Sequence, residues 1–129
     1  MNKTALELIK TANDSILNAQ TEFNNLGSSS LTNKDWSFGS VELTIDGTEP
    51  FIKEAKTICS MASKNRWEKS NPKIVLTKLA TGYSLSFCVL DQCSQMLLKA
   101  FCYEKAQKIF EANGIHAKMV CVLDGNDHL

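Results

Sequence analysis

Cysteine and histidine are the side chains here with the most direct catalytic potential, and the 129 residues include five cysteines and two histidines. A cysteine becomes a good nucleophile where a helix N-terminus or a cation lowers its pKa. Cys93 is the best placed, because it falls in the first turn of a helical pattern, whereas the other cysteines lie within apolar runs. His116 has no evident partner, and His128 is the penultimate residue. We interpret Cys93 as a small core residue and expect no catalytic residue, which favours a non-enzymatic protein.

Carboxylates follow three apolar runs, at Asp46, Asp91 and Asp124. Acids gathered at one sheet edge could bind a metal or do acid–base chemistry. However, Asp46 and Asp124 precede glycine and Asp91 precedes a helical pattern, so turn and cap roles are the better interpretation. Close pairs of metal ligands and a glycine-rich phosphate loop are both missing from the sequence. We therefore expect no metal site and no cofactor.

The one local excess of charge is basic and lies between Lys53 and Lys78, where seven lysines and arginines face two glutamates. Basic groups beside an aromatic ring can bind phosphates and stack a base. The candidate nucleic-acid contacts are Lys64, Arg66, Trp67, Lys69 and Lys73. A solvated helix face, with cations near the negative end of the helix dipole, is the interpretation that we favour.

The composition is that of a single soluble domain, with 43% hydrophobic residues and fourteen acidic against fourteen basic residues. A neutral chain has no overall field that would draw it to nucleic acid or to an anionic membrane. The odd number of cysteines argues against a disulfide framework and favours the cytoplasm. Glu7 and Lys10 interrupt the apolar residues that a signal peptide would need.

The N-terminal segment, from Lys3 to Asn25, has apolar residues at spacings of three and four, which predicts an amphipathic helix. We divide the single domain into an N-terminal helix (1–26), a polar connector (27–35), a core (36–125) and a short tail (126–129).

Within the core, a strand–helix–strand pattern occurs twice, over Ser40–Gly82 and Tyr83–Gly125. The helical runs are Pro50–Lys69 and Gln92–Ala112, and Thr81-Gly82 is expected to form a tight turn in which glycine supplies a positive φ. Two right-handed units joined by a hairpin predict an α+β, ferredoxin-like βαββαβ sandwich with a four-stranded antiparallel sheet and both core helices on one face.

Such a sheet leaves its second face uncovered. Either the N-terminal helix packs across that face, or a second copy or another protein covers it, and we favour a homodimer in which the N-terminal helix takes part. The expected interaction surface comprises Ala12, Ile16, Ala19, Phe23, Thr44, Ser84 and Ser86. The leading function is a small binding module, of accessory or inhibitor-like type, that acts through protein contacts. The alternatives are a nucleic-acid-binding module that uses the basic segment, and a small-molecule binder or enzyme with a pocket between the open face and the N-terminal helix.

Overall fold

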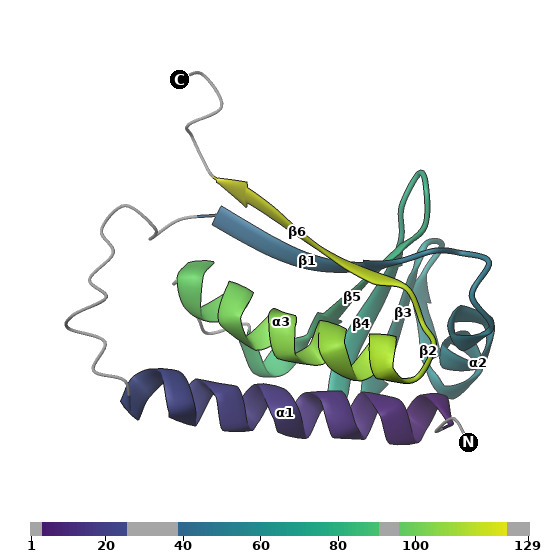
Figure 1. Cartoon of the computed structure of the whole chain (residues 1–129). Coiled ribbons are helices and arrows are strands. Elements are labelled where there is room, and N and C mark those ends of the chain that lie inside the picture. Colours follow the sequence, from purple (N-terminus) through teal and green to yellow (C-terminus); the bar gives the residue numbers. More distant parts are fainter. Residues whose placement is uncertain (1–3, 26–38, 91–95, 124–129) are drawn as a thin grey trace.

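The computed structural model describes residues 4–25, 39–90 and 96–123 (Figure 1). In chain order the elements are α1 (Ala5–Asn25), β1 (Gly39–Ile45), α2 (Pro50–Ile58), β2 (Ser60–Ser63), β3 (Arg66–Ser70), β4 (Lys73–Lys78), β5 (Tyr83–Phe87), the 3-10 turn η3 (Cys88–Leu90), α3 (Met96–Ala112) and β6 (Ala117–Leu123). The described residues form an α+β fold around one open antiparallel sheet.

The predicted N-terminal helix is confirmed, and its start is fixed by a capping box. The Glu7 backbone N–H donates to Thr4 Oγ1 at 3.2 Å, and the Thr4 backbone N–H donates to Glu7 Oε1 at 3.0 Å. This pairing satisfies two N–H groups that a helix start would otherwise leave free. The sequence motif Thr-x-x-Glu at Thr4 and Glu7 is typical of such a helix start. The second helix also starts where expected, with Pro50 in its first turn.

The expected helix from 50 to 69 is wrong in its second half. The helix α2 ends at Ile58, Cys59 takes an extended conformation, and the chain then forms the hairpin of β2 and β3. As part of a strand, Trp67 lies opposite Leu76 of β4 and is buried. Burying a large apolar side chain is worth about 1.5–3 kcal/mol, whereas the helix preference of a residue such as Ala62 is worth only a few tenths. Tertiary burial therefore outweighs local propensity here.

The sheet has the strand order β2-β3-β4-β5-β1-β6, and every neighbouring pair is antiparallel. The prediction of four strands is therefore wrong in number, because the hairpin of β2 and β3 extends the sheet beyond β4. The strand next to the β6 edge is β1, where Leu43 lies opposite Leu85 of β5 on one side and Met119 of β6 on the other.

One face of the sheet carries the core. Alternate residues of the strands, including Leu43, Leu76 and Leu85, are fully buried on this face. The helix α3 packs across β1 and β6, and α1 packs along α3 as the outer layer on the same side (Figure 1). The alternative in which the N-terminal helix covers the second sheet face is therefore wrong.

The turn between β4 and β5 is tight, since the Leu79 N–H donates to the Gly82 carbonyl at 2.7 Å. The expected positive φ at Gly82 is wrong, because among the described glycines only Gly114 has one. Gly82 is needed for space instead: a Cβ there would lie 2.7 Å from the carbonyl oxygen of Ile45. In the part of the chain that is described, no helix combines the length and apolar character that crossing a membrane requires.

Candidate interaction surface

The apolar half of the expected interaction surface lies inside the protomer. Ala12, Ile16, Ala19 and Phe23 are all buried. The Phe23 ring packs against the ring of Phe101 of α3, with 5.6 Å between centroids. These four side chains therefore join α1 to α3 and do not lie on the surface with the sheet residues. The sequence signal for this contact between α1 and α3 was the broad apolar face of α3. A helix with such a face needs the sheet on one side and a second partner on the other.

The other three residues of that surface, Thr44, Ser84 and Ser86, lie together on the sheet face opposite the helices. Ser84 stands directly opposite Thr44 and also opposite Thr77 of β4, so this small side chain is buried between two larger neighbours. We call this the open face. It mixes β-branched and polar residues with charged ones, as is usual where an antiparallel sheet meets water. Its half-buried valines, Val75 and Val120, are separated by two strands.

The two edges of the sheet differ sharply. The strand β2 has only four residues, all exposed, and its pairing with β3 shifts between Met61 and Ser63. Short length and irregular pairing are devices that protect an edge from joining other strands. The strand β6 has seven residues and pairs in unbroken register with all of β1, from Ala117 opposite Ile45 to Leu123 opposite Gly39. Among the described residues no strand pairs with its other side.

The composition of β6 adds to this contrast. Its sequence is AKMVCVL, so Lys118 is its only charged residue and six of seven residues are apolar. Side chains of the same chain hold the start of the strand: Gln107 Nε2 donates to the Ala117 carbonyl at 2.9 Å, and Glu49 Oε2 accepts from the His116 N–H at 3.0 Å. An edge that is long, regular and apolar is ready to accept a further strand. The sequence pattern predicts a strand here but does not show that it lies at an edge of the sheet.

The basic segment does not form one basic face. Lys64 lies in the turn between β2 and β3. Arg66 and Lys73 lie on the open face, and Lys69 lies on the helix side, opposite Ile74. Arg66 Nε is 2.8 Å from the carboxylate of Glu68, which neutralises part of the positive charge.

The aromatic member of the segment is also covered. Trp67 is 7% exposed, and Lys56 Nζ of α2 lies 4.6 Å from its ring centroid. The same ammonium group donates to the Tyr83 hydroxyl at 3.2 Å. The ring of Trp67 thus has a cation–π partner within its own chain.

Of the residues considered for catalysis, the structure describes Asp46 and His116, which lie near one another at the end of the β1 and β6 pairing. Burial raises the pKa of the Cys59 thiol, which disfavours the reactive thiolate. Hydrogen bonds from the Thr48 backbone N–H and hydroxyl hold the pKa of Asp46 below its ordinary value, as expected of a turn residue. Cys93, Asp91, Asp124 and His128 lie outside the described residues. Within the described ranges, no group of three or more His, Cys, Asp or Glu residues could hold a metal ion.

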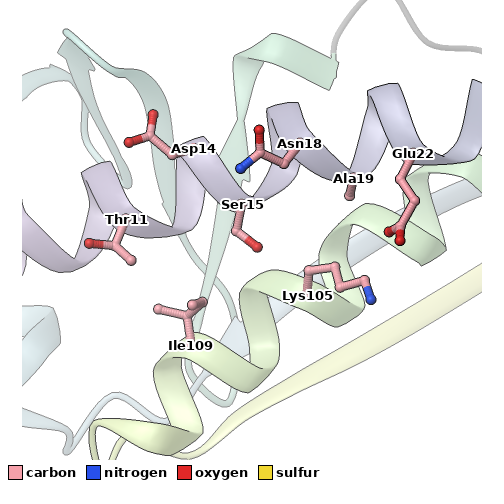
Figure 2. Close-up of a pocket in the computed structure, with 8 residues that line it drawn as sticks. All are labelled: Thr11, Asp14, Ser15, Asn18, Ala19, Glu22, Lys105 and Ile109. Carbon is pink, nitrogen blue, oxygen red and sulfur yellow. The ribbon is translucent and has the colours of Figure 1, made fainter.

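One groove of the described structure lies between α1 and α3 and has a volume of about 590 Å³ (Figure 2). Thr11 and Ser15 of α1 line it opposite Ile109 of α3, and Glu22 and Lys105 extend toward one another at its other end (Figure 2). Thr11, Ser15, Glu22 and Lys105 can form hydrogen bonds, whereas Ile109 offers an apolar surface.

Comparison with protein-family models, curated proteins and solved structures finds no match for this chain.

Proposed function

We propose that this chain is a non-enzymatic binding module that joins a protein partner by adding a strand to the outer edge of β6. The observation that carries the proposal is the strand itself, which is seven residues long, regular, mostly apolar and paired on one side only among the described residues. In strand addition the main chain supplies affinity through hydrogen bonds, and alternate side chains supply specificity.

Two alternatives have less support. A nucleic-acid-binding role would use Trp67 and the basic segment, but the ring is buried and the cations are divided between two faces of the sheet. A small-molecule role would use a pocket between the open face and α1, but α1 packs on α3, on the other side of the sheet.

Peptide selection tests the proposal directly. Peptides of about ten residues, displayed as a random library, are selected on the wild-type chain, and the best one is then synthesised with N-methyl groups at alternate positions. A strand that pairs at an edge uses the N–H groups of every second residue only. We expect N-methylation of one alternating set of peptide residues to abolish binding, and N-methylation of the other set to leave binding nearly unchanged. An equal loss of binding for both sets of methylated residues would contradict strand addition.

The binding edge is identified by two matched variants, Val120→Lys on β6 and Val75→Lys on β4. Both valines are half-buried and lie on the open face, and each stands opposite a glutamate, Glu42 and Glu68 respectively. Only Val120 lies on the edge strand. We expect Val120→Lys to weaken peptide binding at least about tenfold, which is roughly 1.4 kcal/mol, and Val75→Lys to leave it unchanged.

A further inference from the structure

We infer that the partner of β6 is the β6 strand of a second copy of this chain, in a symmetric antiparallel dimer whose twofold axis passes beside Val120. This inference rests on the proposed strand addition and names the strand that is added. It is carried by the regularity of β6, by the order of its residues and by the difference between the two sheet edges.

The first step is the register. In an antiparallel pair, residues opposite one another both point their N–H and C=O groups toward the partner, or both point them away. In a symmetric pair, the twofold axis therefore passes beside a residue that lies opposite the same residue of the second copy. An axis at Val120 places all seven residues of the strand opposite one another, Ala117 with Leu123 and Met119 with Cys121.

The second step is charge. With the axis at Val120, each Lys118 lies opposite Val122, and the two lysines are four residues apart, roughly 14 Å at 3.4 Å per residue. With the axis at Lys118 instead, the two ammonium groups would stand directly opposite and repel. The order of the residues therefore favours the pairing that also uses the whole strand.

The third step is closure. The symmetric pair uses both β6 edges and leaves only the β2 edges at the two ends of a continuous sheet. Because β2 is short, exposed and irregularly paired, the assembly stops at two copies. A head-to-tail contact of β6 with β2 would instead propagate without end, and β2 offers only four residues for it.

The proposed contact between the two β6 strands is small. A ladder of seven residues is smaller than a standard interface of about 1,600 Å², so we expect a reversible dimer with a dissociation constant in the micromolar range. Sedimentation velocity from about 5 to about 500 µM should show the wild-type chain shifting from one to two copies.

The variants Val120→Lys and Val75→Lys separate edge pairing from face-to-face packing. In the dimer, Val120→Lys sets two ammonium groups against each other across the axis. In the single chain, its new lysine faces Glu42, so the fold should keep its melting temperature. We expect Val120→Lys to raise the dissociation constant at least about tenfold and Val75→Lys to leave it unchanged. Equal weakening by both would mean that the open faces pack together, and it would overturn the inference.

Hydrogen exchange of the wild-type chain gives a readout that needs no variant. Alternate amides of β6 should gain protection as the concentration rises, whereas the amides of β2 should not. A chain that stays monomeric at about 500 µM, yet still binds the selected peptides at β6, would reject the dimer and leave the proposed function standing. A chain that neither dimerises nor binds such peptides would reject both.

Discussion

At the scale of single residues, Lys56 joins α2 to two strands of the sheet. Its ammonium group donates to the Tyr83 hydroxyl and lies over the rings of both Trp67 and Tyr83. We expect Lys56→Met to keep the packing of the aliphatic stem and to lower the free energy of unfolding by about 1 kcal/mol, because the hydrogen bond and the cation–π contacts are lost. Urea unfolding measures this.

The matched control is Lys53→Met on the same helix, where the lysine is exposed. It should change the stability by less than about 0.5 kcal/mol. Equal effects of the two substitutions would mean that the aromatic contacts of Lys56 contribute nothing measurable.

Asp46 makes a second residue-scale prediction, on the effect of pH. The Thr48 N–H and hydroxyl bond its carboxylate, so its pKa in the folded chain lies below the ordinary value of 3.8. The ionised group therefore stabilises the fold at pH above 3.8, and this contribution is lost as the pH falls through the lower, folded-state pKa. We expect wild type to be more stable than Asp46→Asn near neutral pH and the difference to vanish in strong acid. A difference that persists unchanged in acid would contradict the charge effect.

At the scale of elements, the periodicity of apolar residues predicted the helices and strands whose formation depends on local sequence patterns. The spacing of Ala12, Ile16 and Ala19 indicated α1, and alternation over Tyr83–Phe87 indicated β5, and the structure has both elements. The β2 and β3 hairpin was missed because its residues include Ala62, Lys64 and Glu68, which favour helices. Its pairing with β4, which buries Trp67 opposite Leu76, makes it a strand.

The β4–β5 turn carries the element-scale prediction. A methyl group on Gly82 would meet the Ile45 carbonyl oxygen at 2.7 Å, and because that oxygen belongs to the backbone, the main chain must shift. We expect Gly82→Ala to destabilise the chain by about 1–3 kcal/mol, measured by urea unfolding.

Gly47→Ala is its control. A methyl group there would contact only the Tyr83 ring, at 3.4 Å or more, which is an ordinary distance. We expect a change within about 0.5 kcal/mol. A tolerated Gly82→Ala would mean that the turn adjusts freely and that space is not the reason for glycine.

At the scale of the whole molecule, the sequence indicates which surfaces are apolar but does not show what each of them contacts. An apolar stripe such as that of α1 fits any apolar surface, and the stripe alone does not say whether that surface is α3, the open face or another chain. The structure buries Ile16 against α3, where its carbonyl accepts from Cys102 Sγ at 3.7 Å. The edge position of β6 depends on the order of all six strands, and no single segment encodes it.

The proposed dimer also changes how the whole molecule responds to concentration. A folded dimer that unfolds to single chains is stabilised by mass action, so its melting temperature rises with protein concentration. Over a hundredfold range we expect the wild-type melting temperature to rise by roughly 2–5 °C. Val75→Lys should show the same rise, whereas Val120→Lys should show a smaller rise, because its repelling edges weaken the dimer. A wild-type melting temperature that does not change with concentration, in a chain that sediments as a dimer, would show that the copies stay associated when they unfold, which would contradict a dimer held only by the pairing of folded β6 strands.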